Sequence, residues 1–443
     1  MGNRNYLFMK SGLLVLLTWP TTAPAAQNDA QLGYGRGWPQ WRGPDRSAVS
    51  EEKITLWPPE KLWEFELGSG VSSVIAYRGR VYGMGHRDEQ DHVYCLDAQS
   101  GQVLWRYSYP AKSDQTSDVR FPGPRSTPAT DGQAVYTLSL DGQVHCLDAA
   151  TGKLLWRKAK TQTGASDSQQ YGVCAPVLVD EQLLVVDVGV HCIAYDKKTG
   201  QELWRTRGSG GWNGAAPMPA QVGNRRYIIH GTGRCLDRQT GRECWSVPYG
   251  EMSVATPVVV GNRVFLAPFH GRNYGGAECA VVEFNGGKPS IVWKNEEVQG
   301  LCLTAVYYQG YLYAPDREDL SLAGESGYGM NLKCLDFQTG KVCWSHRPLA
   351  WPMCLVAGGK LLIQTLQGEL ILADASPEAY REHGRVKLLR GRFWTMPALA
   401  GGKLYCRNNN GRLTAFRVVK PPEPSALPAS SSLQSPCTVP KHK

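Results

Sequence analysis

The sequence lacks the features that define several protein classes. After the N-terminus no apolar run is long enough to span a bilayer, so no transmembrane segment is expected. The 13 cysteines and nine histidines form no C-x-x-C or H-x-x-x-H pair, and the common zinc spacings are therefore absent. There is no G-x-S-x-G elbow, and the Gly-rich stretches at 231–237 and 285–288 lack the rest of a phosphate-binding motif.

Charge of one sign is not concentrated either. The formal net charge is +9 over 443 residues, and no Lys/Arg-rich run carries it, so no nucleic-acid partner is expected. Only 20% of the residues are charged, whereas 42% are hydrophobic. The 49 glycines and 14 tryptophans are typical of many short strands joined by tight turns.

The N-terminus has the pattern of a secretory signal. Arg4 and Lys10 precede the short apolar run Leu13 to Leu17, and Ala23-Pro24-Ala25 resembles a cleavage site. We predict a signal peptide over 1–25, an N-terminal segment over 26–59, a propeller over 60–420 and a disordered Pro/Ser-rich tail over 421–443. The protein is then exported, periplasmic or extracellular, in a compartment that permits disulfides. No cysteine lies near the cleavage site, which argues against a lipid anchor.

A repeated pair of hairpins dominates the remainder of the chain. One half of the unit reads "HCLDAATGKLLWR" at 145–157, with further copies at 94–106, 194–205, 235–246, 282–294 and 333–345. The other half precedes it and reads "STPATDGQAVYTL" at 126–138. Each unit predicts four short strands, and a period of forty to fifty residues is typical of propeller blades.

The tryptophans count the blades. Trp105, Trp156, Trp204, Trp245, Trp293 and Trp344 follow one another at spacings of 51, 48, 41, 48 and 51 residues. A seventh slot is expected near Leu388, and the last repeat, 393–418, ends without its tryptophan strand. The segment 60–68 carries Trp63 with no inner strands before it. We therefore predict an all-β, eight-bladed propeller of four-stranded antiparallel blades, closed by the N-terminal strand. A seven-bladed ring is the alternative.

These repeats carry a family resemblance. The pattern "LDAxTGxxxWR" after "xTPxxxDGxVY" resembles the repeat of pyrroloquinoline-quinone (PQQ)-type β-propellers. Residues 37–52, "GWPQWRGPDRSAVSEE", together with 123–138, resemble an exported branch of that superfamily, similar to the propeller of the outer-membrane assembly machinery. The superfamily also includes quinoprotein alcohol dehydrogenases, so the resemblance is specific for fold and not for function.

The resemblance leaves two functions open. The dehydrogenases hold PQQ beside calcium and carry a disulfide between adjacent cysteines, whereas this chain has no Cys-Cys dipeptide. Asp316, Glu318 and Asp319 form the densest carboxylate group near a blade loop, and we interpret them as a solvated loop. We expect a non-catalytic binding or scaffold module without a cofactor or metal. The alternative is a PQQ-dependent oxidoreductase with PQQ and calcium.

Loop lengths indicate where a ligand would bind. The turns within each hairpin are uniformly tight, whereas the connections between hairpins and between blades hold nearly all the long loops, which belong to the opposite face. We expect a monomer that binds a protein or carbohydrate ligand of the cell envelope at that face. The candidate ligand-binding residues at the inner-strand entrances are Arg125, Tyr171, Trp212, Asn213, Trp351 and Trp394.

Two hairpins carry cysteines on both strands. Counting outward from the turn places Cys334 opposite Cys343, and Cys235 opposite Cys244. Directly opposed residues in antiparallel strands lie within disulfide reach. We therefore predict the disulfides Cys235–Cys244 and Cys334–Cys343. Cys437, in the tail, has no partner by this logic.

Overall fold

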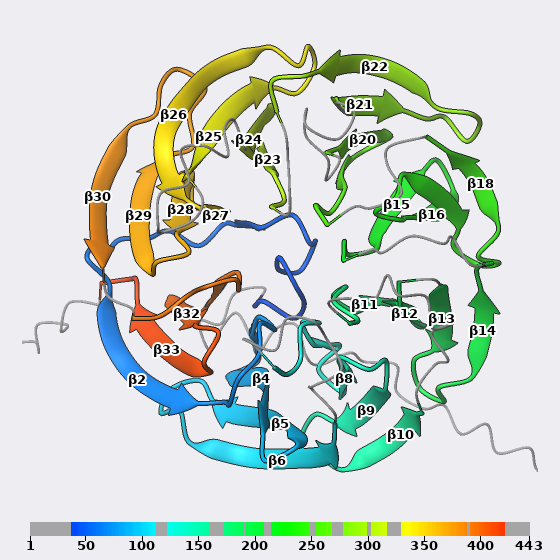
Figure 1. Ribbon diagram of the computed structural model, residues 1–443, viewed down its shortest axis with the longest axis vertical. Coiled ribbons are helices and arrows are strands. Elements are labelled where there is room, and N and C mark those ends of the chain that lie inside the picture. The colour runs from blue at the N-terminus through cyan, green and yellow to red at the C-terminus, as the bar shows by residue number, and fades with distance from the viewer. Residues whose placement is uncertain are drawn as a thin grey trace, which may run out of the picture.

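Eight antiparallel sheets surround a central axis in the computed structural model of the protein (Figure 1). The structure describes residues 37–111, 122–159, 172–189, 191–207, 214–247, 254–267, 278–298, 303–316, 329–387 and 390–420. Within these ranges every regular element is a strand, and no helix has the length and apolarity to cross a membrane. The predicted eight-bladed propeller is confirmed, and the seven-bladed alternative is wrong.

Each blade has four strands, numbered along the chain and ordered from the axis outward. Blade 1 contains β3 (Ile75–Tyr77), β4 (Arg80–Arg87), β5 (Gln90–Asp97) and β6 (Val103–Pro110), and blade 2 contains β7 (Ala129–Thr130), β8 (Ala134–Leu138), β9 (Val144–Asp148) and β10 (Leu154–Lys158). Blade 3 contains β11 (Leu178–Asp180), β12 (Leu183–Asp187), β13 (Cys192–Asp196) and β14 (Glu202–Arg205), and blade 4 contains β15 (Met218–Val222), β16 (Arg225–Ile229), β17 (Arg234–Asp237) and β18 (Glu243–Ser246). Blade 5 contains β19 (Val258–Val260), β20 (Arg263–Leu266), β21 (Cys279–Glu283) and β22 (Ser290–Asn295), and blade 6 contains β23 (Val306–Tyr308), β24 (Tyr311–Asp316), β25 (Gly329–Asp336) and β26 (Val342–Ala350). Blade 7 contains β27 (Met353–Ala357), β28 (Lys360–Gln364), β29 (Glu369–Asp374) and β30 (Glu382–Lys387), and blade 8 contains β31 (Ala398–Ala400), β32 (Lys403–Arg407), β33 (Arg412–Arg417) and β2 (Glu60–Glu66).

The N-terminal strand closes the ring as predicted. Strand β2 pairs antiparallel with β33, so blade 8 combines both ends of the described chain (Figure 1). A further short strand, β1 (Val49–Ser50), pairs in parallel with β27 at the innermost edge of blade 7. The ring therefore has no open junction between the first and the last blade.

The repeated tryptophan connects each blade to the next one. The indole Nε1 of Trp204, in blade 3, donates a hydrogen bond of 2.9 Å to the Arg238 carbonyl in the turn of blade 4. A Cβ on Gly241 of that turn would lie 2.4 Å from the Trp204 ring, and the glycine has a φ of +66°. Only glycine meets both conditions. The same donor–carbonyl contact recurs for Trp63, Trp105, Trp156, Trp293 and Trp344, so these tryptophans are structural.

The turn that receives each tryptophan is built by its aspartate. In blade 4 the Asp237 carboxylate accepts hydrogen bonds from the backbone N–H groups of Gln239 and Thr240 and from the Thr240 hydroxyl. The turns that begin at Asp97, Asp148, Asp196 and Asp336 have the same pattern. The D-x-x-T-G motif is thus a rigid surface for the indole of the preceding blade.

Two blades depart from this pattern. Trp245 faces the degenerate turn after Phe284, and its Nε1 is buried without a hydrogen-bond partner, although the ring contacts Phe284 at 5.0 Å between centroids. In blade 7 the strand register gives the tryptophan position to Gly384, and the slot expected near Leu388, outside the described residues, is wrong. Trp57 of the N-terminal segment lies against Gly384, where an added Cβ would be 2.5 Å from the indole nitrogen.

A β-bulge precedes the tryptophan position in all eight blades. The register between the third and fourth strands shifts there by one residue. The extra residue is exposed and apolar in several blades, for example Leu104, Leu155 and Leu203. A bulge on an outer strand bends it and disturbs pairing with another chain.

The core lies between neighbouring blades and not within one sheet. One buried cluster combines Tyr136 and Cys146 of blade 2 with Leu184 and Ile193 of blade 3.

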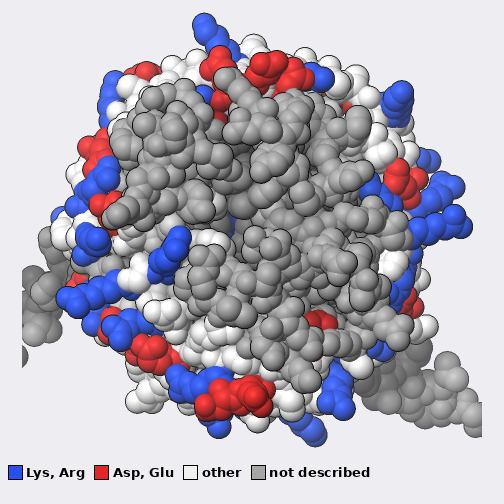
Figure 2. Space-filling model, in the orientation of Figure 1, with Lys and Arg blue, Asp and Glu red and all other residues white. Residues whose placement is uncertain are grey.

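Around the rim of the face shown in Figure 2, side chains of both charge signs are interspersed among the described residues.

The exception at Trp245 supplies a matched test of the tryptophan contact. Trp204→Phe leaves the Arg238 carbonyl without its indole donor, which costs about 1–3 kcal/mol in the free energy of unfolding. Trp245→Phe removes an indole of similar burial that donates no hydrogen bond, so we expect a smaller loss. Denaturant unfolding of both variants measures the difference. Equal losses would show that the hydrogen bond contributes nothing.

Candidate ligand-binding site

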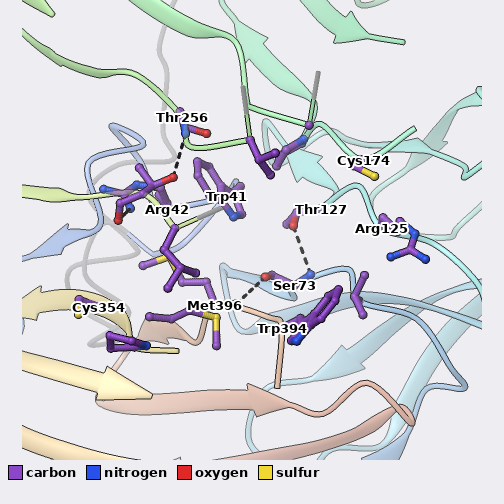
Figure 3. Close-up of a pocket in the computed structure, with 18 residues that line it drawn as sticks. Trp41, Arg42, Ser73, Arg125, Thr127, Cys174, Thr256, Cys354, Trp394 and Met396 are labelled. Carbon is purple, nitrogen blue, oxygen red and sulfur yellow. Dashed lines mark hydrogen bonds between the residues drawn. The ribbon is translucent and has the colours of Figure 1, made fainter. Parts of the chain in front are cut away.

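A cavity of about 150 Å³ lies on the propeller axis, where the innermost strands begin (Figure 3). Every blade contributes to its wall with residues that precede or start its innermost strand, such as Ser73 of blade 1, Thr127 of blade 2 and Met396 of blade 8. The ring of blades therefore determines the position of the site.

Hydroxyl groups in the wall connect adjacent blades. The Met396 backbone N–H donates to Ser73 Oγ at 2.9 Å, and the Ser73 N–H donates to Thr127 Oγ1 at 3.2 Å. In the same way, the Ala216 N–H of blade 4 donates to Thr256 Oγ1 at 2.9 Å, and the Thr256 N–H donates to Thr304 Oγ1 at 3.0 Å. Three of these hydrogen bonds are drawn in Figure 3. Each hydroxyl oxygen thus accepts from the backbone of the preceding blade.

The floor of the cavity is an inserted loop of the N-terminal segment. One leg, at Trp38, exchanges two backbone hydrogen bonds with Ala76, near the far end of the innermost strand of blade 1. The other leg, β1, pairs with the far end of β27. The tip between the legs reaches the beginnings of the innermost strands, where Trp41 and Arg42 line the cavity. Figure 1 shows this dark-blue segment crossing the centre of the ring.

Two buried arginines hold the tip of this loop in place. Arg42 donates from Nη2 to the Ala305 carbonyl of blade 6 at 2.7 Å, and Arg46 donates from Nη1 to the Val177 carbonyl of blade 3 at 2.8 Å. Burial lowers the pKa of each guanidinium to about 9, so both remain charged at neutral pH. Both also lie over Trp41, with guanidinium carbons 5.4 and 6.0 Å from the ring centroid.

The structure brings three of the predicted site residues to this region. Arg125 and Trp394 line the cavity, from blades 2 and 8 (Figure 3). Trp351 lies beside them and stacks on Trp394, with ring centroids 6.2 Å apart and planes 9° from parallel. Trp351 has a φ of +53°, which is unusual for a bulky residue and typical of binding sites. Tyr171, Trp212 and Asn213 lie outside the described residues.

Sequence reasoning missed the floor of the site. Trp41 and Arg42 belong to a segment that was expected only to lead into the propeller. Their signal is present in "GWPQWRGPDR", where two tryptophans are followed by two arginines before any repeat begins. The wall hydroxyls had a clearer signal, because Thr127 and Thr256 occupy the same place in the repeated "TP" dipeptide.

Sulfur atoms also line the cavity without forming a centre. Cys174 and Cys354 belong to blades 3 and 7, and they lie at opposite sides of the view in Figure 3. Burial raises the pKa of Cys174 to about 11 and that of Cys354 to about 12, so both are neutral thiols at physiological pH. In the part of the chain that the structure describes, no group of three or more His, Cys, Asp or Glu side chains could hold a metal ion.

An Asp–His–Thr arrangement between blades 3 and 4 has a structural explanation. Asp187 contacts His230 Nε2 at 2.6 Å, and His230 Nδ1 lies 2.7 Å from the Thr232 hydroxyl. The imidazole also accepts the Thr232 N–H within its own turn. Ser139 and Thr365 accept a backbone N–H within the corresponding turns of blades 2 and 7. His230 therefore belongs to a repeated turn-capping position.

The fold and the repeats define a PQQ-type repeat β-propeller. The sequence model of the family described as "Outer membrane protein assembly factor BamB" matches residues 89–307 and 210–347, more than half of the chain. The protein belongs to this family.

The individual relatives include quinoprotein dehydrogenases, a tetrathionate hydrolase and an assembly factor. The quinohemoprotein alcohol dehydrogenase ADH-IIG of Pseudomonas putida is 25% identical over 39% of this chain and 24% of its own length. The outer membrane protein assembly factor BamB of Kangiella koreensis is 24% identical over 46% of this chain and 49% of its own length. The chain thus spans less than half the length of these curated relatives. The crystal structure of a quinohemoprotein alcohol dehydrogenase from Comamonas testosteroni matches with a TM-score of 0.64 and 15% identity over 92% of this chain and 86% of its own, a likeness of fold alone.

The described wall does not fit the calcium ion of the dehydrogenases. Calcium takes six to eight oxygen ligands, carboxylates commonly among them, and no Asp or Glu is among the described residues that line the cavity. Asp316 is buried but pairs with Lys333 at 3.0 Å, away from the cavity lining. Glu318 and Asp319 lie outside the described residues.

The bulge corrects the predicted register of the cysteine hairpins. Leu335 pairs with Val342 as predicted, but Cys334 pairs with Trp344, and Cys343 is the extra residue of the bulge. In the same way Cys235 pairs with Trp245 and not with Cys244. All four side chains are free thiols in the structure. Burial and then the neighbouring Cys343 raise the pKa of Cys334, so the two thiols lie close enough to interact.

The two disulfides stay a prediction, which thiol counting tests. A bulge sets two residues against one, so Cys343 still flanks Cys334. Denatured, unreduced protein from an oxidising compartment is expected to show four fewer reactive thiols than the 13 of the sequence. Cys244→Leu/Cys343→Leu, which installs the residue of the other blades, is the control and leaves every remaining cysteine reactive. Finding all 13 thiols in the wild type refutes both bonds.

Proposed function

We propose that this protein is an exported, non-catalytic binding module that engages a partner through the face on which the axial cavity opens. The observation that carries the proposal is the position of the cavity among the long connections. Strand β6 ends at Pro110 and β7 begins at Ala129, and β24 ends at Asp316 and β25 begins at Gly329; these four strand ends lie on this face. On the other face the turn between β19 and β20 has only two residues. Long loops on a rigid scaffold are the usual carriers of binding.

The family supports a protein as the partner. Its description names an outer membrane protein assembly factor, and a factor that takes part in assembling proteins is expected to bind proteins. The described wall offers hydroxyls, guanidinium groups and indoles, which serve binding without supplying a general base or a metal. A carbohydrate partner has no separate support, although indole faces also suit sugars.

The second candidate is a PQQ-dependent oxidoreductase. It is favoured by the similarity to quinohemoprotein alcohol dehydrogenases and by the cationic, aromatic character of the cavity. Against it stands the lack of carboxylates in the described wall, because the enzymes of this type require calcium beside the quinone.

Reconstitution separates the two candidates. Purified protein is incubated with PQQ and calcium, and alcohol-dependent reduction of a redox dye is recorded beside a quinoprotein alcohol dehydrogenase as the positive control. We expect no turnover, because the described cavity lining has no carboxylate to hold calcium. Alcohol-dependent turnover above the rate of PQQ and calcium alone would overturn the non-catalytic assignment.

Photo-crosslinking tests the binding face. Arg87 ends β4 on the cavity side of blade 1, and Gln99 lies in the tight turn after β5 on the opposite side; both are exposed. A photo-reactive amino acid at position 87 is expected to form a discrete crosslinked species in intact cells, and the same group at position 99 is not. Crosslinks from position 99 alone would assign the binding surface to the wrong face.

A further inference from the structure

The wall of the axial cavity presents hydrogen-bond donors. The oxygens of Ser73, Thr127, Thr256 and Thr304 each accept a backbone N–H from the preceding blade. Among the described residues none of these four hydroxyls donates a hydrogen bond in turn. A hydroxyl whose oxygen is already engaged offers its O–H to whatever occupies the cavity. The wall is thus a ring of donors contributed by four blades.

Positive charge and aromatic surface complete the lining. Arg42 lies in the floor and Arg125 in the wall, and no Asp, Glu or His is among the lining residues that the structure describes. The indoles of Trp41 and Trp394 supply flat apolar surface at the floor and at the wall. A cavity of about 150 Å³ has the size that accommodates one benzene-like ring. Donors and guanidinium groups without an acidic group favour an anion.

We infer that the axial cavity binds a small planar carboxylate, of the size of one aromatic ring with its carboxyl group. This inference deepens the proposed function and rests on it, because it names the ligand class for the same face. The carboxylate accepts from the hydroxyl ring, the positive charge of the guanidinium groups favours it, and the aromatic ring of the ligand lies on the indole faces. The ligand is a free small molecule or an aromatic carboxylate group carried by a partner, and its chemistry at the cavity is the same in both cases.

Three probes of equal size test the charge preference. Isothermal titration calorimetry of the full chain is carried out with benzoate, its neutral analogue benzamide and the cation benzamidine. We expect saturable binding of benzoate, with benzamide and benzamidine at least about tenfold weaker, since opposite charge close by is strongly favoured in a partly dehydrated cavity. No binding of benzoate, or equal binding of benzamide, overturns the inference.

A second test replaces a wall residue whose side chain makes no hydrogen bond, so that the substitution does not disturb the contacts that hold the blades together. Val254 is partly exposed and lines the cavity just before the innermost strand of blade 5. Val254→Glu places a carboxylate in the wall and is expected to weaken benzoate at least about tenfold by like-charge repulsion. Val254→Gln, which has nearly the same shape without the charge, retains the affinity within about threefold. Unchanged benzoate affinity in Val254→Glu contradicts a site in this cavity.

The outcomes also separate this inference from the proposed function. Crosslinks from position 87 without benzoate binding would leave the binding module standing and remove the carboxylate site. Benzoate binding together with PQQ-dependent turnover would retain the anion site and remove the non-catalytic assignment. The heat of benzoate binding, measured with both Val254 variants, shows whether the observed benzoate binding takes place in the cavity.

Discussion

The contact between an outer-strand tryptophan and the turn of the next blade is the interaction on which the architecture depends. Four-stranded sheets of this size bury little apolar surface alone, and the core lies between them. The indole fills the space above a glycine and donates to a carbonyl of the same turn, as Trp204 does at Gly241 and Arg238. Each contact fixes the angle between two blades, and the seam at Trp63 and Ala98 uses the same contact. Because the contact repeats around the ring, the outer-strand tryptophans determine how the innermost strands are arranged around the axis.

A second constraint acts at the centre. The inserted N-terminal loop makes backbone or guanidinium hydrogen bonds to blades 1, 2, 3, 6 and 7, for example Pro39 to Thr130 and Arg46 to Val177. It therefore joins sheets that do not touch one another. The cost of burying two guanidinium groups is offset by carbonyl partners and by Trp41 between them. The loop tip forms the floor of the axial cavity, and this asymmetry distinguishes the two faces.

The sequence carried most of the architecture and only part of the site, for physical reasons. The strands, the turns and the number of blades follow from short-range patterns that repeat along the chain. The N-terminal strand with Trp63 has no inner strands before it, and the last blade, which lacks an outer strand, is where it pairs. The bulge at Cys343 shifts a register that a regular hairpin would keep, so cysteine opposition failed. Gly384 is recognised as a tryptophan slot only when Trp57, far away in sequence, is seen against it. Arg125 and Trp394 were found because they occupy one position of the repeat, whereas Arg42 binds carbonyls 262 and 263 residues away, which no local pattern encodes.

The family combines one scaffold with different chemistry on its axis, so function has to be argued from the cavity wall. In this chain the positions before the innermost strands hold Val71, Arg125, Cys174, Val254 and Trp394, none of them a carboxylate. The hydroxyls beneath them each accept one backbone N–H from the preceding blade, and each still carries an O–H hydrogen that can be donated to a ligand. A wall with guanidinium groups and with no carboxylate among its described residues is poorly suited to calcium and better suited to an anion. The hydroxyls that close the inner ring thus also supply hydrogen-bond donors to the cavity.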